Sequence, residues 1–482
     1  MTTLWTSDDL ARATGGRVTC DFAATGISID TRSLEPGDLF IALKDVRDGH
    51  DFVAQALARG AAGALVSRIP AGCSETDPLV LVEDVLPALE ALGRAGRART
   101  RAKVIAVTGS VGKTSTKEML RAVLAGQGSV HAAEASFNNH WGVPLTLARM
   151  PAGCDFAVIE IGMNHPGEIA PLARIARPHV AMITTIAAAH MAAFEGIEGI
   201  AREKAAIFEG LEPGGTAVIP SGLDVTPILQ AAAREKTGRI LQFGADPADD
   251  FALTEATVTQ DTTIVQATRH GAPILFKIRS AGRHFAMNAL GVLAVAEAVG
   301  ADPAIAACDL GQWQPVAGRG LRETIHLDVV DDHMTIDLID DAYNANPTSL
   351  DAALHVLAVA EPRHGVGRVG AGRRIAVLGD MLELGPDENA LHAAFADHPT
   401  LRHIDLLHCV GPRMRHLWNA LPRQKRGEWH EAAADLAARA RFLVDAGDVV
   451  LVKGSKGSRV SLVVDALRKL GQAGASEIKG AE

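Results

Sequence analysis

The sequence of 482 residues is poor in aromatic side chains, which make up 4% of it and include a single tyrosine, Tyr343. No apolar run approaches the length of a membrane span. The N-terminus has no basic region followed by an apolar core, so it does not resemble a secretory signal. The five cysteines stand singly without metal-site spacing, which favours buried thiols in a reducing compartment. We therefore expect a cytoplasmic protein without a membrane span.

Charge and length exclude further classes. A formal net charge of −10 argues against nucleic acid as a partner, and it means that an anionic substrate must be held by local cations. The hydrophobic fraction of 48% and the charged fraction of 22% are typical of a globular protein. A chain of 482 residues is too long for one ordinary core, so three domains are expected.

One segment has the pattern of a phosphate-binding loop. The apolar run 104–107 ends before Gly109–Thr114, which reads Gly-Ser-Val-Gly-Lys-Thr and opens a helical pattern. Glycines let backbone N–H groups approach phosphate oxygens, and the helix N-terminus adds partial positive charge. Lys113 can reach the β- and γ-phosphates, and the Thr114 hydroxyl can hold Mg²⁺. The full pattern is one glycine short, because Val107 stands at the first glycine position. This segment predicts binding of ATP or GTP.

The fold class expected is α/β, in three units of residues 1–100, 101–315 and 316–482. In the central unit, short apolar strands at 104–107, 156–161, 180–186 and 216–219 alternate with helices, which predicts a doubly wound, mostly parallel sheet. Antiparallel strands are expected over 250–280. The last unit has expected strands at 334–339, 375–378, 406–410 and 449–452. The basic stretch 94–103 is interpreted as a solvated helix end and linker.

Polar residues near the expected strand ends are candidates for a metal site. Glu160 stands in an apolar strand, where a carboxylate is costly unless it is paired or bound to metal. His190 follows another strand, and Lys204 lies in a helical pattern. Taken singly they fit a bridged glutamate, a loop histidine and a solvated lysine. With Thr114 they could form a Mg²⁺ site for phosphoryl transfer.

Later segments carry further candidates. Asn288 stands at the start of a helical pattern, and Arg319 lies between two glycines near the domain boundary. The segment 340–347 follows a strand, and its asparagines and proline indicate a shaped loop, although an ordinary turn fits equally well. The glycines and cations of 453–459 suit a carboxylate or phosphate, and a surface turn is the alternative.

The chain resembles the Mur ligases, the ATP-dependent amide-forming enzymes of peptidoglycan synthesis, over essentially its whole length. The segments that carry the resemblance are Thr108–Thr114, Ser136–Leu147, Glu160–Glu168, Asp341–Pro347 and Gly379–Gly385. The resemblance implies a three-domain architecture: a UDP-substrate-binding N-terminal domain, a central P-loop domain, and a Rossmann-like C-terminal domain for the incoming amino substrate. Within the family, the motifs look most like those of the last cytoplasmic step, which joins D-alanyl-D-alanine to UDP-N-acetylmuramoyl-tripeptide.

The resemblance also implies roles for individual residues. Thr114 and Glu160 match Mg²⁺ ligands, His190 matches a ligand of a second Mg²⁺, and Lys204 matches a carbamylated lysine. Catalytic roles are implied for Lys113, Lys204, His190 and Arg319. The residues implied in ATP binding are Thr108, Gly109, Ser110, Val111, Gly112, Lys113, Thr114, Asn288, Arg319 and Asp341. Those implied in substrate binding are Asp30, Thr31, Arg32, Asn138, Asn139, Asn344, Asn346, Lys453 and Ser455.

Three rival functions remain at the level of sequence. Two are ligases of the same architecture, namely the Mur ligase that adds the third amino acid and a folylpolyglutamate synthase. The Asp-Asn-Pro-Arg motif typical of the former is absent from the sequence. The third rival is a P-loop nucleotide switch without ligase activity, which the Glu160 and Lys204 sites disfavour. We expect a monomer that acts on small molecules in cell wall synthesis and so supports cell shape and division.

Overall fold

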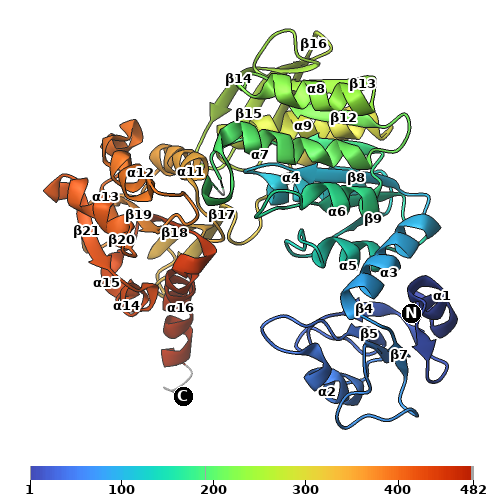
Figure 1. Ribbon diagram of the computed structural model, residues 1–482. Helices are drawn as coiled ribbons and strands as arrows, with labels where there is room; N and C mark the ends of the chain where they lie inside the picture. The colour runs from blue at the N-terminus through green and yellow to red at the C-terminus, as the bar shows by residue number, and fades with distance from the viewer. Residues whose placement is uncertain (1, 190, 479–482) are drawn as a thin grey trace.

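The computed structural model describes residues 2–189 and 191–478, and Figure 1 shows three α/β units in sequence order. In the view of Figure 1, the C-terminal unit lies to the left of the central unit and the first unit lies below it at the right, so these two units lie apart from one another. Within the described ranges, the helices are too short or too polar to cross a membrane.

The first unit is built on a five-stranded sheet in the order β2-β7-β6-β5-β4. Strand β2 is antiparallel to β7, and the other neighbours are parallel. A separate ladder joins β1 and β3. The strands β4 and β5 lie on either side of the turn at 35–37. The elements are β1 (Trp5–Thr6), α1 (Ser7–Thr14), β2 (Arg17–Val18), β3 (Ala23–Ala24), β4 (Gly26–Ser28), β5 (Asp38–Ile41), α2 (Val53–Ala58), β6 (Gly63–Val66) and β7 (Leu79–Leu81).

The central unit contains a nine-stranded sheet in the order β16-β15-β14-β13-β12-β11-β8-β10-β9. The pairs from β9 to β14 are parallel, and β14, β15 and β16 are antiparallel, as the sequence predicts for 250–280. The strands are β8 (Lys103–Thr108), β9 (Val130–Ala132), β10 (Phe156–Glu160), β11 (Val180–Ile183), β12 (Thr216–Pro220), β13 (Arg239–Gly244), β14 (Phe251–Val258), β15 (Thr263–Arg269) and β16 (Ala272–Ile278).

Helices cover both faces of this sheet, which is the doubly wound arrangement. Ile105 and Val107 of β8 pack into one core with α4, α9 and α10, and Val104 and Ala106 pack into the opposite core with α5, α6, α7 and α8. The alternation follows from the two-residue period of a strand, and burial on both faces explains the continuous apolar run. The helices are α4 (Lys113–Ala125), α5 (Gly142–Ala148), α6 (Ile169–Ala176), α7 (Gly196–Ala205), α8 (Thr226–Lys236), α9 (Arg283–Ala298) and α10 (Pro303–Leu310).

The last unit repeats this arrangement with six strands in the order β17-β18-β22-β19-β20-β21, of which only β17 pairs in antiparallel fashion. One core contains residues of α11 and α13, with α12 packed against α13, and the other contains residues of α14, α15 and α16. The elements are β17 (Leu321–His326), β18 (Thr335–Asp341), α11 (Pro347–Val359), β19 (Arg374–Gly379), α12 (Glu388–Ala394), β20 (Leu406–Val410), α13 (Met414–Ala420), β21 (Arg426–His430), α14 (Ala433–Ala437), α15 (Ala440–Leu443), β22 (Val449–Lys453) and α16 (Ser461–Ile478).

The helix α3 (Val85–Arg99) joins the first unit to the central one, and here the prediction of a solvated basic helix end is wrong in part. Arg97 is buried, and its guanidinium donates to the carbonyls of Ala176 and Arg177 at 2.9 and 2.8 Å. The Arg99 guanidinium stacks over the Trp5 ring at 3.7 Å. These arginines satisfy carbonyls that lie far away in sequence, which composition alone does not reveal.

We expect Arg97→Ala to destabilise the junction between α3 and α6 by about 1–3 kcal/mol, because the buried Ala176 carbonyl and the partly buried Arg177 carbonyl lose a charged donor. Urea unfolding followed by circular dichroism should show a lower midpoint. Arg94→Ala is the matched control, because the Arg94 side chain is 55% exposed and pairs only with Glu90 on the same helix. Equal midpoints for the two variants would contradict this role of Arg97.

Candidate functional site

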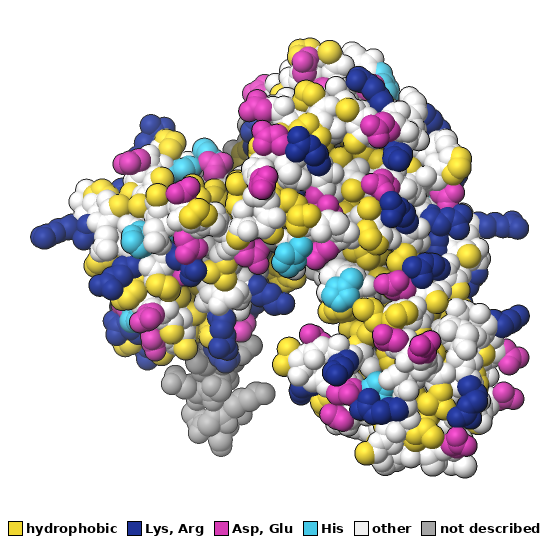
Figure 2. Space-filling view, in the orientation of Figure 1, with side chains coloured by type: hydrophobic (Ala, Val, Ile, Leu, Met, Phe, Trp, Pro, Cys, Tyr) yellow, Lys and Arg dark blue, Asp and Glu magenta, His cyan; other side chains and the backbone are white. Residues whose placement is uncertain are grey.

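A cavity of about 550 Å³ lies between the central and C-terminal units. The loop after β8 and the end of β10 contribute one wall, and the loops after β18 and β22 contribute the other. Parallel strands end at the same edge of a sheet, so this is the position where α/β sheets bind ligands. On the face drawn in Figure 2, acidic and basic side chains are interspersed, so the described residues of this face form no large patch of one charge. Attraction of an anionic ligand therefore depends on the cations that line the cavity.

The loop between β8 and α4 is shaped by two glycines. Gly112 has φ +87° and Gly109 has φ +151°. A Cβ atom at Gly109 would lie 1.9 Å from Thr184 Oγ1, so a larger residue does not fit. The Thr184 hydroxyl donates to the Val111 carbonyl at 2.6 Å, and Ser110 N donates to the Thr185 carbonyl at 2.8 Å. The residues after β11 therefore fix the loop conformation.

Two cations of the cavity lie near this loop. The Lys113 ammonium donates to the Gly109 carbonyl at 2.7 Å, and burial lowers the pKa of Lys113 from its usual value. Arg319, between the central and C-terminal units, lies over the ring of Tyr343 at 4.0 Å. Lys113 and Arg319 can both offset the charge of a bound polyphosphate.

The carboxylate of Glu160 is buried at the end of β10 and is held from two sides. Thr114 Oγ1 donates to one oxygen at 3.0 Å, and Asn138 Nδ2 donates to the other at 2.7 Å. Ser136 Oγ lies 3.4 Å from Thr114 Oγ1. The side-chain oxygens of Glu160, Thr114 and Ser136 thus converge beside the phosphate loop, and this donor set fits Mg²⁺.

Lys204 is buried on α7. Its pKa is lowered well below the usual lysine value, first by burial and then by repulsion from Lys113. A larger fraction of Lys204 is therefore in the neutral amine form than for a lysine in water. The interpretation of Lys204 as solvated is wrong, because its side chain is buried. His190 lies outside the described residues.

The C-terminal wall of the cavity is tied together by Lys453. Its ammonium donates to Asp341 Oδ2 at 2.7 Å and to the Asn344 carbonyl at 3.0 Å. Burial raises the pKa of Asp341. Asn346 caps α11, since its side-chain oxygen accepts from Ser349 N at 2.9 Å. The Ser455 hydroxyl donates to the Ala345 carbonyl at 3.2 Å, so β22 positions the loop after β18.

The structure brings most of the predicted residues into one cavity. Its walls include Ser110, Val111, Gly112, Lys113, Thr114, Asn138, Asn139, Glu160, Asn288, Arg319, Asp341, Asn344, Asn346, Lys453 and Ser455. Residues absent from the walls among those described are Asp30, Thr31, Arg32, Thr108, Gly109 and Lys204. Arg32 lies on the first unit, where it pairs with Asp30 and holds the pKa of that carboxyl at about 2.

Sequence reasoning missed His284 and gave no role to Tyr343. His284 lines the cavity one turn before Asn288, and burial lowers its pKa to about 4. The spacing of four residues within one helical pattern is the signal that could have found it. Tyr343 lies between Asp341 and Asn344 in the sequence. Only the folded structure shows that the Arg319 guanidinium packs over its ring.

Comparison with known proteins gives two family matches. The Mur ligase middle domain matches residues 107–296, and the Mur ligase glutamate ligase domain matches residues 327–456. UDP-N-acetylmuramoyl-tripeptide–D-alanyl-D-alanine ligase of Rickettsia prowazekii is 31% identical to this chain over 96% of this chain and 99% of its own length. The Escherichia coli protein of the same name is 34% identical over 94% of this chain and 95% of its own length.

Solved structures agree with these relatives. MurF from Acinetobacter baumannii has a TM-score of 0.79 and 30% identity, with coverage of 96% of this chain and 99% of that one. MurF from Thermotoga maritima in complex with ADP has a TM-score of 0.74 and 26% identity, with coverage of 93% and 98%.

We expect Gly109→Ala to weaken nucleotide binding, because the added Cβ would overlap Thr184 Oγ1 and distort the phosphate loop. Fluorescence titration with an ATP analogue should show an affinity loss of at least about tenfold, or ~1.4 kcal/mol. Gly153→Ala is the control, because a Cβ there meets no atom within 4 Å. Unchanged affinity in a folded Gly109→Ala variant would contradict the fixed loop.

Proposed function

Since this chain belongs to the Mur ligase family, we propose that it joins D-alanyl-D-alanine to UDP-N-acetylmuramoyl-tripeptide and splits ATP to ADP and phosphate. The observation that carries this proposal is the shared cavity, in which the phosphate loop faces the loops after β18 and β22. The full-length similarity to ligases of that name supports the choice of substrates. Its product is a precursor of peptidoglycan.

The nucleotide binds at the phosphate loop. The triphosphate lies against the backbone N–H groups of 110–114, with Lys113 and Arg319 on its β- and γ-phosphates. Asn288 contacts the adenine and Asp341 lies near the ribose. The support is the position of Asn288 beside the loop, since a Cβ at Gly112 would lie 2.9 Å from Asn288 Nδ2. The ADP complex of the Thermotoga maritima relative also supports a nucleotide of the adenine class.

Thr114 and Glu160 would hold Mg²⁺, with His190 and a carbamylated Lys204 at a second ion. When bound, Mg²⁺ supplies positive charge to the phosphoryl oxygens. Carbamylation replaces the Lys204 cation by an anion, and so it converts the repulsion from Lys113 into attraction. Burial of Lys204 favours the neutral amine that this reaction requires.

The residues of the chain act mainly by positioning and electrostatics. Lys113 and Arg319 offset charge on the γ-phosphoryl group while the substrate carboxylate attacks phosphorus and ADP leaves, which gives an acyl phosphate. The amine of D-alanyl-D-alanine then attacks the acyl carbon, phosphate leaves, and the amine loses a proton. Asn344, Asn346, Lys453 and Ser455 orient the dipeptide. Asn138 and Asn139 lie on the tripeptide side, and Asp30, Thr31 and Arg32 bind the UDP moiety on the first unit.

The three units serve as domains of residues 1–100, 101–315 and 316–482, for the UDP substrate, ATP and the amino substrate respectively. The protein acts in the cytoplasm as a monomer on small-molecule substrates. Its product supports cell shape and division through wall synthesis.

Phosphate release measured with paired substrates tests the proposal. UDP-N-acetylmuramoyl-tripeptide with D-alanyl-D-alanine should give stoichiometric phosphate and a new amide product by mass spectrometry. UDP-N-acetylmuramoyl-dipeptide with a diamino acid, and folate with glutamate, should give little. Ligation with either control pair would favour the corresponding rival, and phosphate release without any product would favour a nucleotide switch.

Lys204→Ala should lose most of the ligase activity, by about 10²-fold or more, because a metal-holding carbamate is lost. A high concentration of a short carboxylic acid should restore part of it. ¹³C-bicarbonate should give a carbamate NMR signal in the parent protein and none in Lys204→Ala. Arg202→Ala is the control, since Arg202 is exposed on the same helix. Full activity of Lys204→Ala would remove this residue from the site.

Arg32→Ala should raise the KM for the nucleotide-sugar peptide by about tenfold, or ~1.4 kcal/mol, and leave the KM for ATP near its original value. The reason is the distance in fold between the first unit and the phosphate loop, together with the 83% exposure of the Arg32 side chain. Arg17→Ala, on the same unit and 60% exposed, should change neither constant. A parallel rise in both constants for Arg32→Ala would indicate a structural role.

A further inference from the structure

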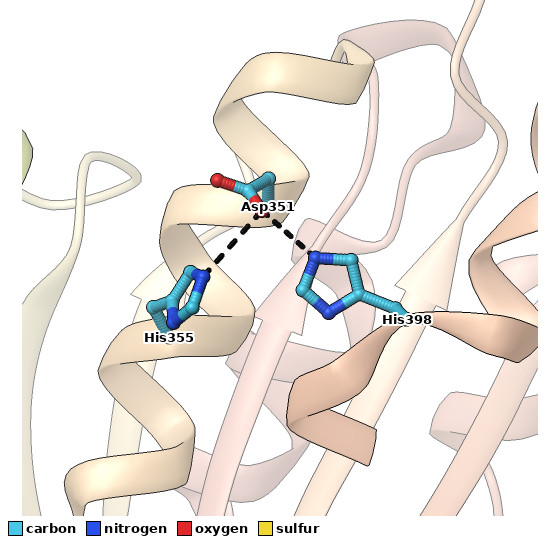
Figure 3. Close-up of side chains that lie close together, drawn as sticks. All are labelled: Asp351, His355 and His398. Carbon is cyan, nitrogen blue, oxygen red and sulfur yellow. Dashed lines mark hydrogen bonds and ion pairs between the residues drawn. The ribbon is translucent and has the colours of Figure 1, made fainter.

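On the C-terminal unit, Asp351, His355 and His398 converge at the surface (Figure 3). Asp351 and His355 are four residues apart on α11, so they share one side of the helix. His398 comes from the segment that follows α12 and packs against α11. One oxygen or nitrogen atom of each residue lies within 4.8 Å of the other two.

His398 is already oriented for a ligand. Its ring stacks on Phe395 with centroids 5.7 Å apart and planes 17° apart, and its Nδ1 lies 2.7 Å from Thr400 Oγ1. Its Nε2 lies 2.8 Å from Asp351 Oδ1. Thr400 N also donates to Nδ1 of His398 at 3.4 Å, so contacts with Thr400 fix the orientation of the ring and leave Nε2 facing Asp351. Contacts at the second ring nitrogen likewise orient the rings of metal-binding histidines.

The other two residues are open to solvent. The side chain of Asp351 is 52% exposed and that of His355 is 61% exposed, and His355 Nε2 lies 3.6 Å from Asp351 Oδ1. Ligand atoms about 2.0–2.2 Å from one ion can be no more than ~4.4 Å apart. The three ligand atoms lie within 4.8 Å of one another, which is close to this limit. A small rotation of the exposed His355 side chain therefore suffices to bring all three atoms within reach of one ion.

From this geometry we propose that Asp351, His355 and His398 bind a zinc-like divalent ion at a site separate from the ligation chemistry. Two imidazoles and one carboxylate suit Zn²⁺, whereas Mg²⁺ prefers oxygen ligands. Three protein ligands leave a fourth position for water. A neighbouring side of α11 lines the cavity through Ser349, Ala353 and Val356, so the ion would clamp the outer side of a helix that forms the amino-substrate wall.

Isothermal titration of the full chain with Zn²⁺ tests this site, in excess Mg²⁺ so that the proposed oxygen-rich site is occupied. We expect one Zn²⁺ equivalent whose affinity falls by more than about tenfold in His355→Ala, in His398→Ala and in Asp351→Asn. His416→Ala, at an exposed position on α13, is the matched control and should retain full affinity. Co²⁺ in place of Zn²⁺ should give a visible absorption band that is lost in the same three variants.

Because His355 is exposed, His355→Ala should keep the parent circular dichroism spectrum and ligase activity, so loss of the ion can be separated from loss of fold or function. Zn²⁺ should also raise the thermal midpoint of the parent protein and of His416→Ala, and have little effect on that of His355→Ala. Zinc binding that is equal in the parent and in His355→Ala, or absent in the parent, would overturn the proposal and leave a local histidine–aspartate pair.

Discussion

The site depends on the buried carboxylate of Glu160. A charge at the end of an apolar strand is tolerated only with partners, and Glu160 has two, Thr114 on α4 and Asn138 on the segment before α5. One side chain thus joins β10 to the phosphate loop and to the 136–139 segment. The Glu160 carboxylate and the Thr114 hydroxyl are also the oxygens that fit Mg²⁺. The arrangement that satisfies the buried charge is therefore the same one that could hold a cation.

The cavity is lined by cations although the chain as a whole is acidic. The net charge is −10, yet Lys113, Arg319 and Lys453 stand on opposite walls of the cavity. Each is held by a neighbour: Lys113 by the Gly109 carbonyl, Arg319 by the Tyr343 ring, and Lys453 by Asp341. Preorganised cations cost little reorganisation when phosphate charge develops, which is how such sites stabilise phosphoryl transfer.

The α/β units and their motifs were predictable because their signals are local. Buried parallel strands produce continuous apolar runs, so β8, β10, β20 and β22 were predicted within two residues of their observed ends. The loop Gly109–Thr114 has a fixed spacing of glycine, lysine and threonine, so the glycine loop between β8 and α4 was predictable from residues alone. The roles of further site residues were predicted from the family resemblance, because an asparagine in a helix or an arginine in a turn can serve many different functions.

By itself, the sequence determined the α/β class, the phosphate loop and the strand end on which Glu160 stands, whereas it placed Asp341 in the loop after a strand that the structure extends to Asp341. Only the tertiary structure decided which distant residues meet. It buried Lys204 near Lys113, carried Arg319 onto Tyr343, and turned Arg97 from an expected surface charge into a buried donor for carbonyls about 80 residues away. It also brought His398 to Asp351. The physical reason is that burial and pairing depend on packing between elements, which strand and helix periodicity do not encode.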